Sequence, residues 1–144
     1  SGFEAPIHLT WARNNRSALI RVPVTKRGKE PVATRIEYRA IDPACNPYLA
    51  FSAMLAAGLA GVEGKYELQP ETSEATDTEL LQGGIGLLPA SLAEALDAME
   101  SSELMKETLG EHIFEWFLRN KRAEWADYKA HVSQFEIERY IRNW

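Results

Sequence analysis

The sequence has very little cysteine and no long apolar stretch. Its single cysteine, Cys45, excludes an internal disulfide and favours a reducing compartment. The most apolar run, YLAFSAMLAAGLAGV, is too short to cross a bilayer and contains two glycines. The opening residues, SGFEAPIHLT, show neither the basic nor the apolar segment of a secretory signal. We therefore expect a cytoplasmic protein that does not bind a membrane.

The composition is that of one globular domain, but its charge is unevenly distributed. The 144 residues are 45% hydrophobic and 26% charged, with a net charge of −5. Residues 1–47 hold eight basic and four acidic side chains, a net of +4, which leaves −9 for residues 48–144. A basic segment of this kind indicates a polyanion or a phosphorylated small molecule as ligand. It is too small, with too few aromatic residues, to favour nucleic acid.

The first 42 residues have the pattern of extended chain. We predict strands over IHLTWA, SALIRVPV and VATRIEYRA, with TKRGKEP between the last two as a hairpin loop. Three strands alone would leave two exposed sheet edges. Either the helices that follow cover these edges, or further strands lie outside the 144 residues, and we favour the second.

The remainder reads as four or so helices. Asn46 caps and Pro47 opens a helix to about Gly61 that is apolar nearly all round, which predicts burial in the core. A long surface loop is expected over 63–90. Capping boxes are predicted at Ser91–Glu94 and Ser133–Glu136, and a helix end at Gly110 precedes a long amphipathic helix over 111–132. The predicted fold class is α+β: a short antiparallel β element over 1–42, then a mainly helical region over 43–144.

The stretch TRIEYR places three charges on one strand face. On a strand, Arg35, Glu37 and Arg39 would point the same way, and Arg16 and Arg21 belong to the neighbouring segment. Guanidiniums repel one another, so this grouping favours an anion between them. Glu37, kept ionised by its neighbours, suits a hard cation such as Mg²⁺. The alternative is a solvated charged hairpin in which Glu37 is only an ion-pair partner.

Four motifs in register resemble one enzyme family. GFEAP, NRSALIRVP, TRIEYR and DPACNPYLAFSAMLAAGLAG, at this spacing, are similar to the C-terminal part of bacterial type I glutamine synthetase. LPASLAEALDAM, LGEHIFEWFLRNKRAEW and the closing helix extend the resemblance to the whole chain. It implies that the β element is part of the family's catalytic barrel. It also implies ligation of ammonia to the γ-carboxylate of L-glutamate, with ATP, through γ-glutamyl phosphate.

The resemblance also implies a role for each charged residue of the motifs. Glu4 matches a flap residue that closes over glutamate and helps to deprotonate ammonium, and Arg16 matches an arginine on the transferring phosphoryl group and the substrate. Arg39 matches an arginine on glutamate. The ATP-binding set implied is Arg16, Arg21 and Arg35, and Glu37 matches a ligand of the nucleotide-side Mg²⁺ or Mn²⁺.

Assembly, completeness and regulation are implied in the same way. Family members form hexameric rings, usually two stacked as a dodecamer, and Trp116, Phe117, Trp125, Tyr140 and Trp144 are candidates for interface or core. The chain corresponds to about the last third of a family member, so we expect it to be inactive alone. Residues 67–90 contain no tyrosine, so we expect no adenylylation there. Two alternatives stay open: a γ-glutamyl amine or polyamine ligase of the same fold, and a non-catalytic anion-binding or assembly module.

Overall fold

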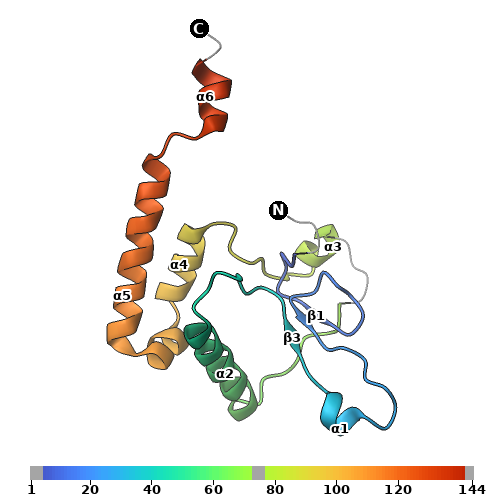
Figure 1. The fold of residues 1–144 in the computed structure, drawn as a ribbon. Coiled ribbons are helices and arrows are strands. Elements are labelled where there is room, and N and C mark those ends of the chain that lie inside the picture. The colour runs from blue at the N-terminus through green and yellow to red at the C-terminus, as the bar shows by residue number, and fades with distance from the viewer. Residues whose placement is uncertain (1–4, 73–76, 142–144) are drawn as a thin grey trace. The chain divides into compact units, whose positions relative to one another are not determined.

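The computed structural model describes residues 5–72 and 77–141. Small strands come first and helices dominate the rest of the chain, which confirms the predicted fold class (Figure 1). The chain divides into two compact units, Ser1–Phe51 with Gly58–Leu88 and Ser52–Ala57 with Pro89–Trp144. Among the described residues, no helix combines the length and the apolar character that a bilayer crossing requires.

Three two-residue strands form the sheet of the first unit. They are β1 (Trp11–Ala12), β2 (Ile20–Arg21) and β3 (Glu37–Tyr38), in the order β1-β2-β3. β2 and β3 are antiparallel, as predicted, whereas β1 and β2 are parallel. The usual parallel crossover of about a dozen residues or more is unnecessary here, because strands this short need only a tight return between them.

The third predicted strand is wrong over its first half. Residues Glu30–Ala33 form a short helix, α1, with Pro31 in its first turn, a position that proline favours. Thr34 ends this turn because its backbone is extended, with φ −65° and ψ 124°. Its backbone N–H and its hydroxyl both donate to the carbonyl of Glu30. Arg35 therefore lies outside β3 and does not share a strand face with Glu37.

Helix α2 (Pro47–Glu63) begins as predicted but is not buried. The Asn46 side-chain oxygen accepts hydrogen bonds from the backbone N–H groups of Tyr48 and Leu49, at 3.0 and 3.4 Å. No residue of α2 is buried, and Tyr48 is 83% exposed. The prediction of burial was wrong for this chain because the described residues do not cover the helix with apolar surface.

The expected loop over 63–90 contains more structure than predicted. Helix α3 (Asp77–Gln82) lies within it. Residues 86–88 then run beside residues 7–9, where the N–H of Leu9 donates to Gly86 and that of Leu88 donates to Ile7, both at 2.9 Å. The loop prediction holds only for the segments between these features.

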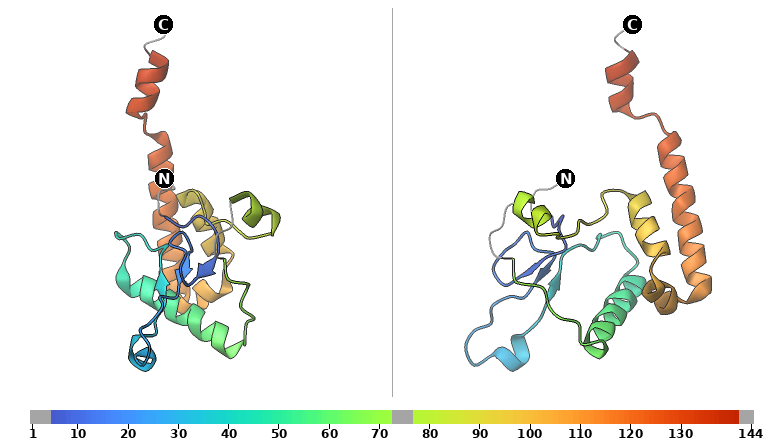
Figure 2. Two further views of the ribbon diagram at one scale, coloured as in Figure 1. Left: turned by 90° about the vertical axis from the view of Figure 1, so that its right-hand side faces the viewer. Right: turned by 180° about the vertical axis from the view of Figure 1, so that it is seen from behind.

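Two helices make the core of the second unit. α4 (Leu92–Glu100) packs against α5 (Glu103–Ala130), and these two helices lie side by side in Figure 1 and in the right-hand view of Figure 2. Leu96, Phe114 and Leu118 are buried at their contact, and Phe117 packs against that cluster. Gly110, with φ 71° and ψ 152°, breaks the helical path of α5 where the sequence predicts a helix end.

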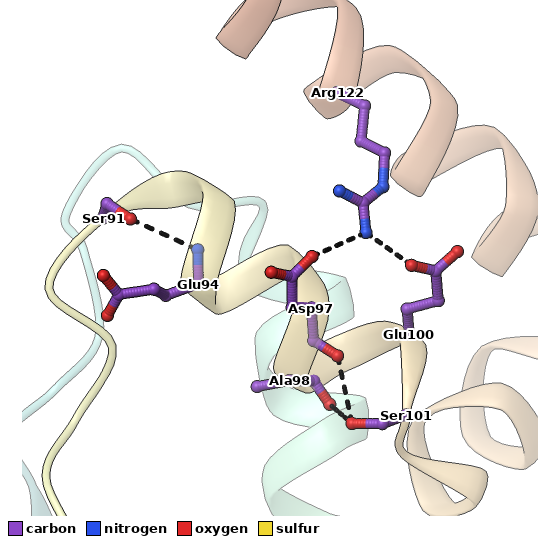
Figure 3. Close-up of polar contacts among 7 residues, drawn as sticks. All are labelled: Ser91, Glu94, Asp97, Ala98, Glu100, Ser101 and Arg122. Atoms are coloured by element: carbon purple, nitrogen blue, oxygen red, sulfur yellow. Dashed lines mark hydrogen bonds and ion pairs between the residues drawn. The ribbon is translucent and has the colours of Figure 1, made fainter.

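Polar contacts join α5 to α4 and cap the start of α4 (Figure 3). Arg122 on α5 donates to Asp97 at 2.9 Å and also pairs with Glu100, both on α4. These hydrogen bonds, first that to Asp97, raise the pKa of Arg122. At the start of α4 the Glu94 N–H donates to the Ser91 hydroxyl, whereas the Glu94 carboxylate accepts from the N–H of Ala90. In the predicted capping box the Glu94 carboxylate would accept from the N–H of Ser91, whereas here it accepts from the residue before.

The second capping box is confirmed at α6 (Gln134–Tyr140). The Ser133 N–H donates to the Glu136 carboxylate at 2.8 Å, and the Glu136 N–H donates to the Ser133 hydroxyl at 3.2 Å. The aromatic residues divide between core and surface. Phe117 is in the core, Trp125 stacks on Tyr128, Trp116 and Tyr140 are exposed, and Trp144 lies outside the described residues.

Candidate anion-binding site

The site is centred on a pair of residues that the sheet register brings together. Arg21 on β2 and Glu37 on β3 are directly opposite one another in the antiparallel pairing. Arg21 Nη1 donates to Glu37 Oε2 at 2.8 Å, and each side chain is about one-third exposed. The Nε of Arg21 is buried and has no hydrogen-bond partner among the described residues. The pair therefore leaves donor capacity on the guanidinium for a further acceptor.

A second guanidinium reaches the same carboxylate from outside the strand. Arg35 Nη2 lies 3.5 Å from Glu37 Oε1, and Arg35 Nη1 donates to the carbonyl of Ala33 at 3.3 Å. Two positive charges thus share one negative charge, which leaves a net charge of +1 on these three side chains. Such an excess favours an anion, and the planar guanidinium suits phosphate and carboxylate oxygens.

Arg39 is held beside β2 by its backbone, whereas Arg16 lies in a separate exposed turn. The backbone N–H of Arg39 donates to the carbonyl of Leu19 at 2.9 Å, which holds Arg39 beside β2. Arg16 lies in the exposed turn between β1 and β2, and its guanidinium makes no ion pair within the described residues. The Asn15 side-chain oxygen shapes this turn, because it accepts from the backbone N–H and the hydroxyl of Ser17 at 2.8 and 2.6 Å.

One predicted residue cannot be placed. Glu4 lies outside the described residues. Arg21, Arg35 and Glu37 are brought together by direct contacts, and Arg39 is held next to β2. The strand-face argument that grouped Arg35 with Glu37 was wrong about the strand, although the two side chains do meet.

The described residues do not make a complete metal site. Within 5–72 and 77–141 there is no group of three or more His, Cys, Asp or Glu side chains placed to hold a metal ion. Both oxygens of Glu37 face guanidinium groups, so this carboxylate could supply one ligand at most. Mg²⁺ needs several oxygen ligands. The donor set therefore fits an anion and does not by itself fit a divalent cation.

The sequence did not predict a set of contacts that supports the Arg16 turn. Residues 69–72, which we call the strap, run along the edge of β1 that does not pair with β2. The N–H of Thr72 donates to the carbonyl of Trp11 at 3.0 Å, and the Trp11 indole donates to the carbonyl of Gln69 at 2.7 Å. No motif distinguishes this polar stretch, because its pairing depends on a segment 58 residues away.

Comparison with known proteins finds one family that matches nearly the whole chain. The profile of the family described as "Glutamine synthetase, catalytic domain" matches residues 1–140. Relatives named glutamine synthetase include one from Mycolicibacterium smegmatis, 48% identical, and one from Methanocaldococcus jannaschii, 49% identical. Each match covers 97% of this chain and about a third of the relative, 32% and 31% respectively.

Solved structures agree with this match. The structure described as "GmaS/ADP complex-Conformation 1" is 33% identical, with a TM-score of 0.80 over 96% of this chain and 30% of that one. The Plasmodium falciparum glutamine synthetase structure has a TM-score of 0.76 over 96% of this chain and 35% of that one, and its 21% identity supports the fold alone. The chain thus spans about a third of the length of the proteins it matches.

Proposed function

We propose, since the chain belongs to the glutamine synthetase catalytic-domain family, that it is the C-terminal part of an ATP-dependent glutamate–ammonia ligase. The observation that carries the proposal is the cluster of Arg21, Glu37 and Arg35, joined by contacts at the positions of the family motifs. We assign the chain to the bacterial type I group, although mycobacterial and archaeal relatives match at nearly equal identity.

The reaction has two steps, each of which moves negative charge. An oxygen of the glutamate γ-carboxylate attacks the γ-phosphorus of ATP, and the bond to the ADP oxygen breaks. Ammonia then attacks the acyl carbon of γ-glutamyl phosphate, and inorganic phosphate leaves as a proton is removed from nitrogen. Phosphoryl transfer relies mainly on positioned cations around the oxygens that gain and lose charge. Clustered arginines supply that requirement.

The proposed roles are those that the family resemblance implies for each residue. Arg16 is assigned to the transferring phosphoryl group and the substrate, and its exposure is compatible with that role. Arg21, with its unpaired buried Nε, and Arg35 are assigned to ATP. Arg39 is assigned to the glutamate substrate, and Glu4 to the flap that excludes water and deprotonates ammonium.

We propose Glu37 as a single ligand of a shared Mg²⁺ or Mn²⁺. Such an ion, when bound, would neutralise phosphate charge. Within the described residues no group of three or more His, Cys, Asp or Glu side chains is placed to hold a metal ion, so further ligands would come from outside these described residues. Binding of the ion would require the Glu37 carboxylate to exchange at least one of its guanidinium contacts for the metal.

The whole protein would then be an oligomer in the cytoplasm. Hexameric rings, two of them stacked as a dodecamer, would place the site at subunit boundaries. The exposed Trp116 and Tyr140 are available for such interfaces. The single cysteine agrees with a reducing cytoplasmic environment.

The test compares the full-length protein with the 144-residue chain alone. The full-length enzyme is expected to form glutamine from glutamate, ammonia and ATP, whereas the 144-residue chain shows no turnover. Robust turnover by the short chain, or none by the full-length protein, would overturn the proposal. A panel of amines offered in place of ammonia separates the glutamine synthetase assignment from a γ-glutamyl amine or polyamine ligase. Relatives at 48–49% identity that carry the glutamine synthetase name favour ammonia.

A further inference from the structure

We propose that the strap, residues 69–72, positions the Arg16 turn, and that Glu71 and Asn15 are its two positioning residues. The inference rests on the proposed function for the role of Arg16, but its structural half stands on contacts alone. It adds to the family motifs a segment that lies between α2 and α3, more than 40 residues after the NRSALIRVP motif that it contacts.

Glu71 fixes the chain three residues before Arg16. One carboxylate oxygen of Glu71 accepts the backbone N–H of Arg13 at 2.7 Å, and the other pairs with the Arg13 guanidinium. A carboxylate that binds a backbone N–H and a side chain of the same residue restrains both its position and its orientation. The Arg13 guanidinium also lies 5.3 Å from the centre of the Trp11 ring, which joins it to the edge of β1.

Asn15, which directly precedes Arg16, joins the turn to the strap. Its side-chain NH₂ donates to the carbonyl of Thr72 at 3.4 Å, while its oxygen accepts from the N–H and hydroxyl of Ser17. One amide therefore joins the strap to both sides of Arg16. Ala18, which follows Ser17, is fully buried, so the turn is also anchored at its far end.

These contacts restrain the backbone of Arg16 and leave its side chain exposed. A guanidinium held in this way is preorganised, because little of its ordering cost remains when an anion binds. Displacement of a catalytic group by about 1 Å can cost about a hundredfold in rate. Glu71 and Asn15 would therefore affect phosphoryl transfer through Arg16, without contact with the substrate.

The chain contains a matched control for Glu71. Glu67 lies four residues earlier, just outside the strap but also between α2 and α3. It is exposed and makes no hydrogen bond or ion pair within the described residues. Replacing either glutamate by alanine removes one negative charge from the stretch between α2 and α3. Only Glu71→Ala removes the contacts to Arg13.

The experiment uses the full-length enzyme and a double-mutant cycle with Arg16. We expect Glu71→Ala to lower kcat/KM for ATP about tenfold or more, Asn15→Ala to act in the same direction, and Glu67→Ala to change it less than twofold. In an Arg16→Ala background, Glu71→Ala should have less than a twofold further effect. An equal effect of Glu71→Ala in both backgrounds, or equal effects of Glu71→Ala and Glu67→Ala, would overturn the positioning role.

Hydrogen exchange measures the structural half without any turnover. In the Glu71→Ala variant, amides of residues 13–17 should exchange at least several-fold faster, whereas those of α4 and α5 should be unchanged. Unchanged exchange at 13–17 would refute the strap even in an active enzyme. If exchange is faster in the variant but the unmodified full-length protein makes no glutamine, the strap is supported and the proposed function is refuted. The two failures are therefore distinguishable.

Discussion

Arg21 and Glu37 meet across two strands that run in opposite directions, with 2.8 Å between Nη1 and Oε2. The contact is partly exposed, and an exposed ion pair contributes only about 0–1 kcal/mol. Its value for stability is therefore small, whereas a metal ligand at Glu37 would be essential for activity. The two interpretations of Glu37 give different results when it is replaced.

Glu37→Gln should separate these interpretations. In the 144-residue chain we expect a loss of no more than about 1 kcal/mol in the free energy of unfolding, measured by urea denaturation. In the full-length enzyme we expect turnover to fall by about two orders of magnitude or more, because an amide is a poor ligand for Mg²⁺. Glu124→Gln, which breaks an exposed pair with Lys121, is the control. Near-normal turnover of Glu37→Gln would leave Glu37 as an ion-pair partner only.

Arg16→Lys should lower activity with no effect on folding. Arg16 is exposed and makes no ion pair within the described residues, so the melting temperature should not change. Lysine keeps the charge but loses the planar donor fork, and we expect a tenfold or greater loss of kcat in the full-length enzyme. Arg27→Lys, in the exposed turn before α1, should leave kcat unchanged. Equal kcat for Arg16→Lys and the unmodified enzyme would argue against a phosphoryl contact.

The capping box of α6 should weaken in acid. Hydrogen bonds from Ser133, first that from its backbone N–H, lower the pKa of Glu136 below its ordinary value of 4.5. A lowered pKa in the folded state means that this stabilisation is fully present above pH 4.5 and is lost as the pH falls through the folded-state value. The protection factors of α6 amides, which correct for the slower intrinsic exchange in acid, should therefore fall below pH 4.5. Glu136→Gln should remove most of this dependence on pH, and an unaltered pH profile in that variant would contradict the assignment.

Leu96→Ala should destabilise the second unit. Leu96 is 2% exposed and contacts the cluster of Phe114 and Leu118, so its truncation leaves a cavity. We expect a loss of about 2–4 kcal/mol. Leu55→Ala on α2, where the side chain is 65% exposed in this chain, should cost less than about 1 kcal/mol. Similar losses for the two variants in thermal denaturation of the 144-residue chain would indicate that α2 is covered in solution.

The sequence was informative for several features that depend on neighbouring residues. Asn46 and Ser133 each accept the hydrogen bonds expected of a cap, and α5 breaks at Gly110. These features are predictable because the side chain and the backbone groups it satisfies lie within a few residues of each other. The antiparallel register that pairs Arg21 with Glu37 likewise agrees with the predicted hairpin.

Features that depend on distant surfaces were not predictable. The apolar composition of α2 predicts burial, but the surface that would bury it is not among the described residues. Glu71 is one acid in a polar stretch, and its importance depends on Arg13, 58 residues earlier. One local feature was missed as well: Pro31 favoured the first turn of α1 over a longer strand, which removed Arg35 from the strand face.

The conformation of Gly110 sets an unusual rule for what can replace it. Its φ of 71° and ψ of 152° lie in a region that residues with a side chain rarely enter. Apart from its chain neighbours and the nearby helix backbone, no atom of the described residues lies within 4 Å of where a Cβ would be, so space is not what limits substitution. The limit is handedness: alanine and leucine should be similarly unfavourable, whereas a D-residue introduced by chemical synthesis should be the better tolerated replacement.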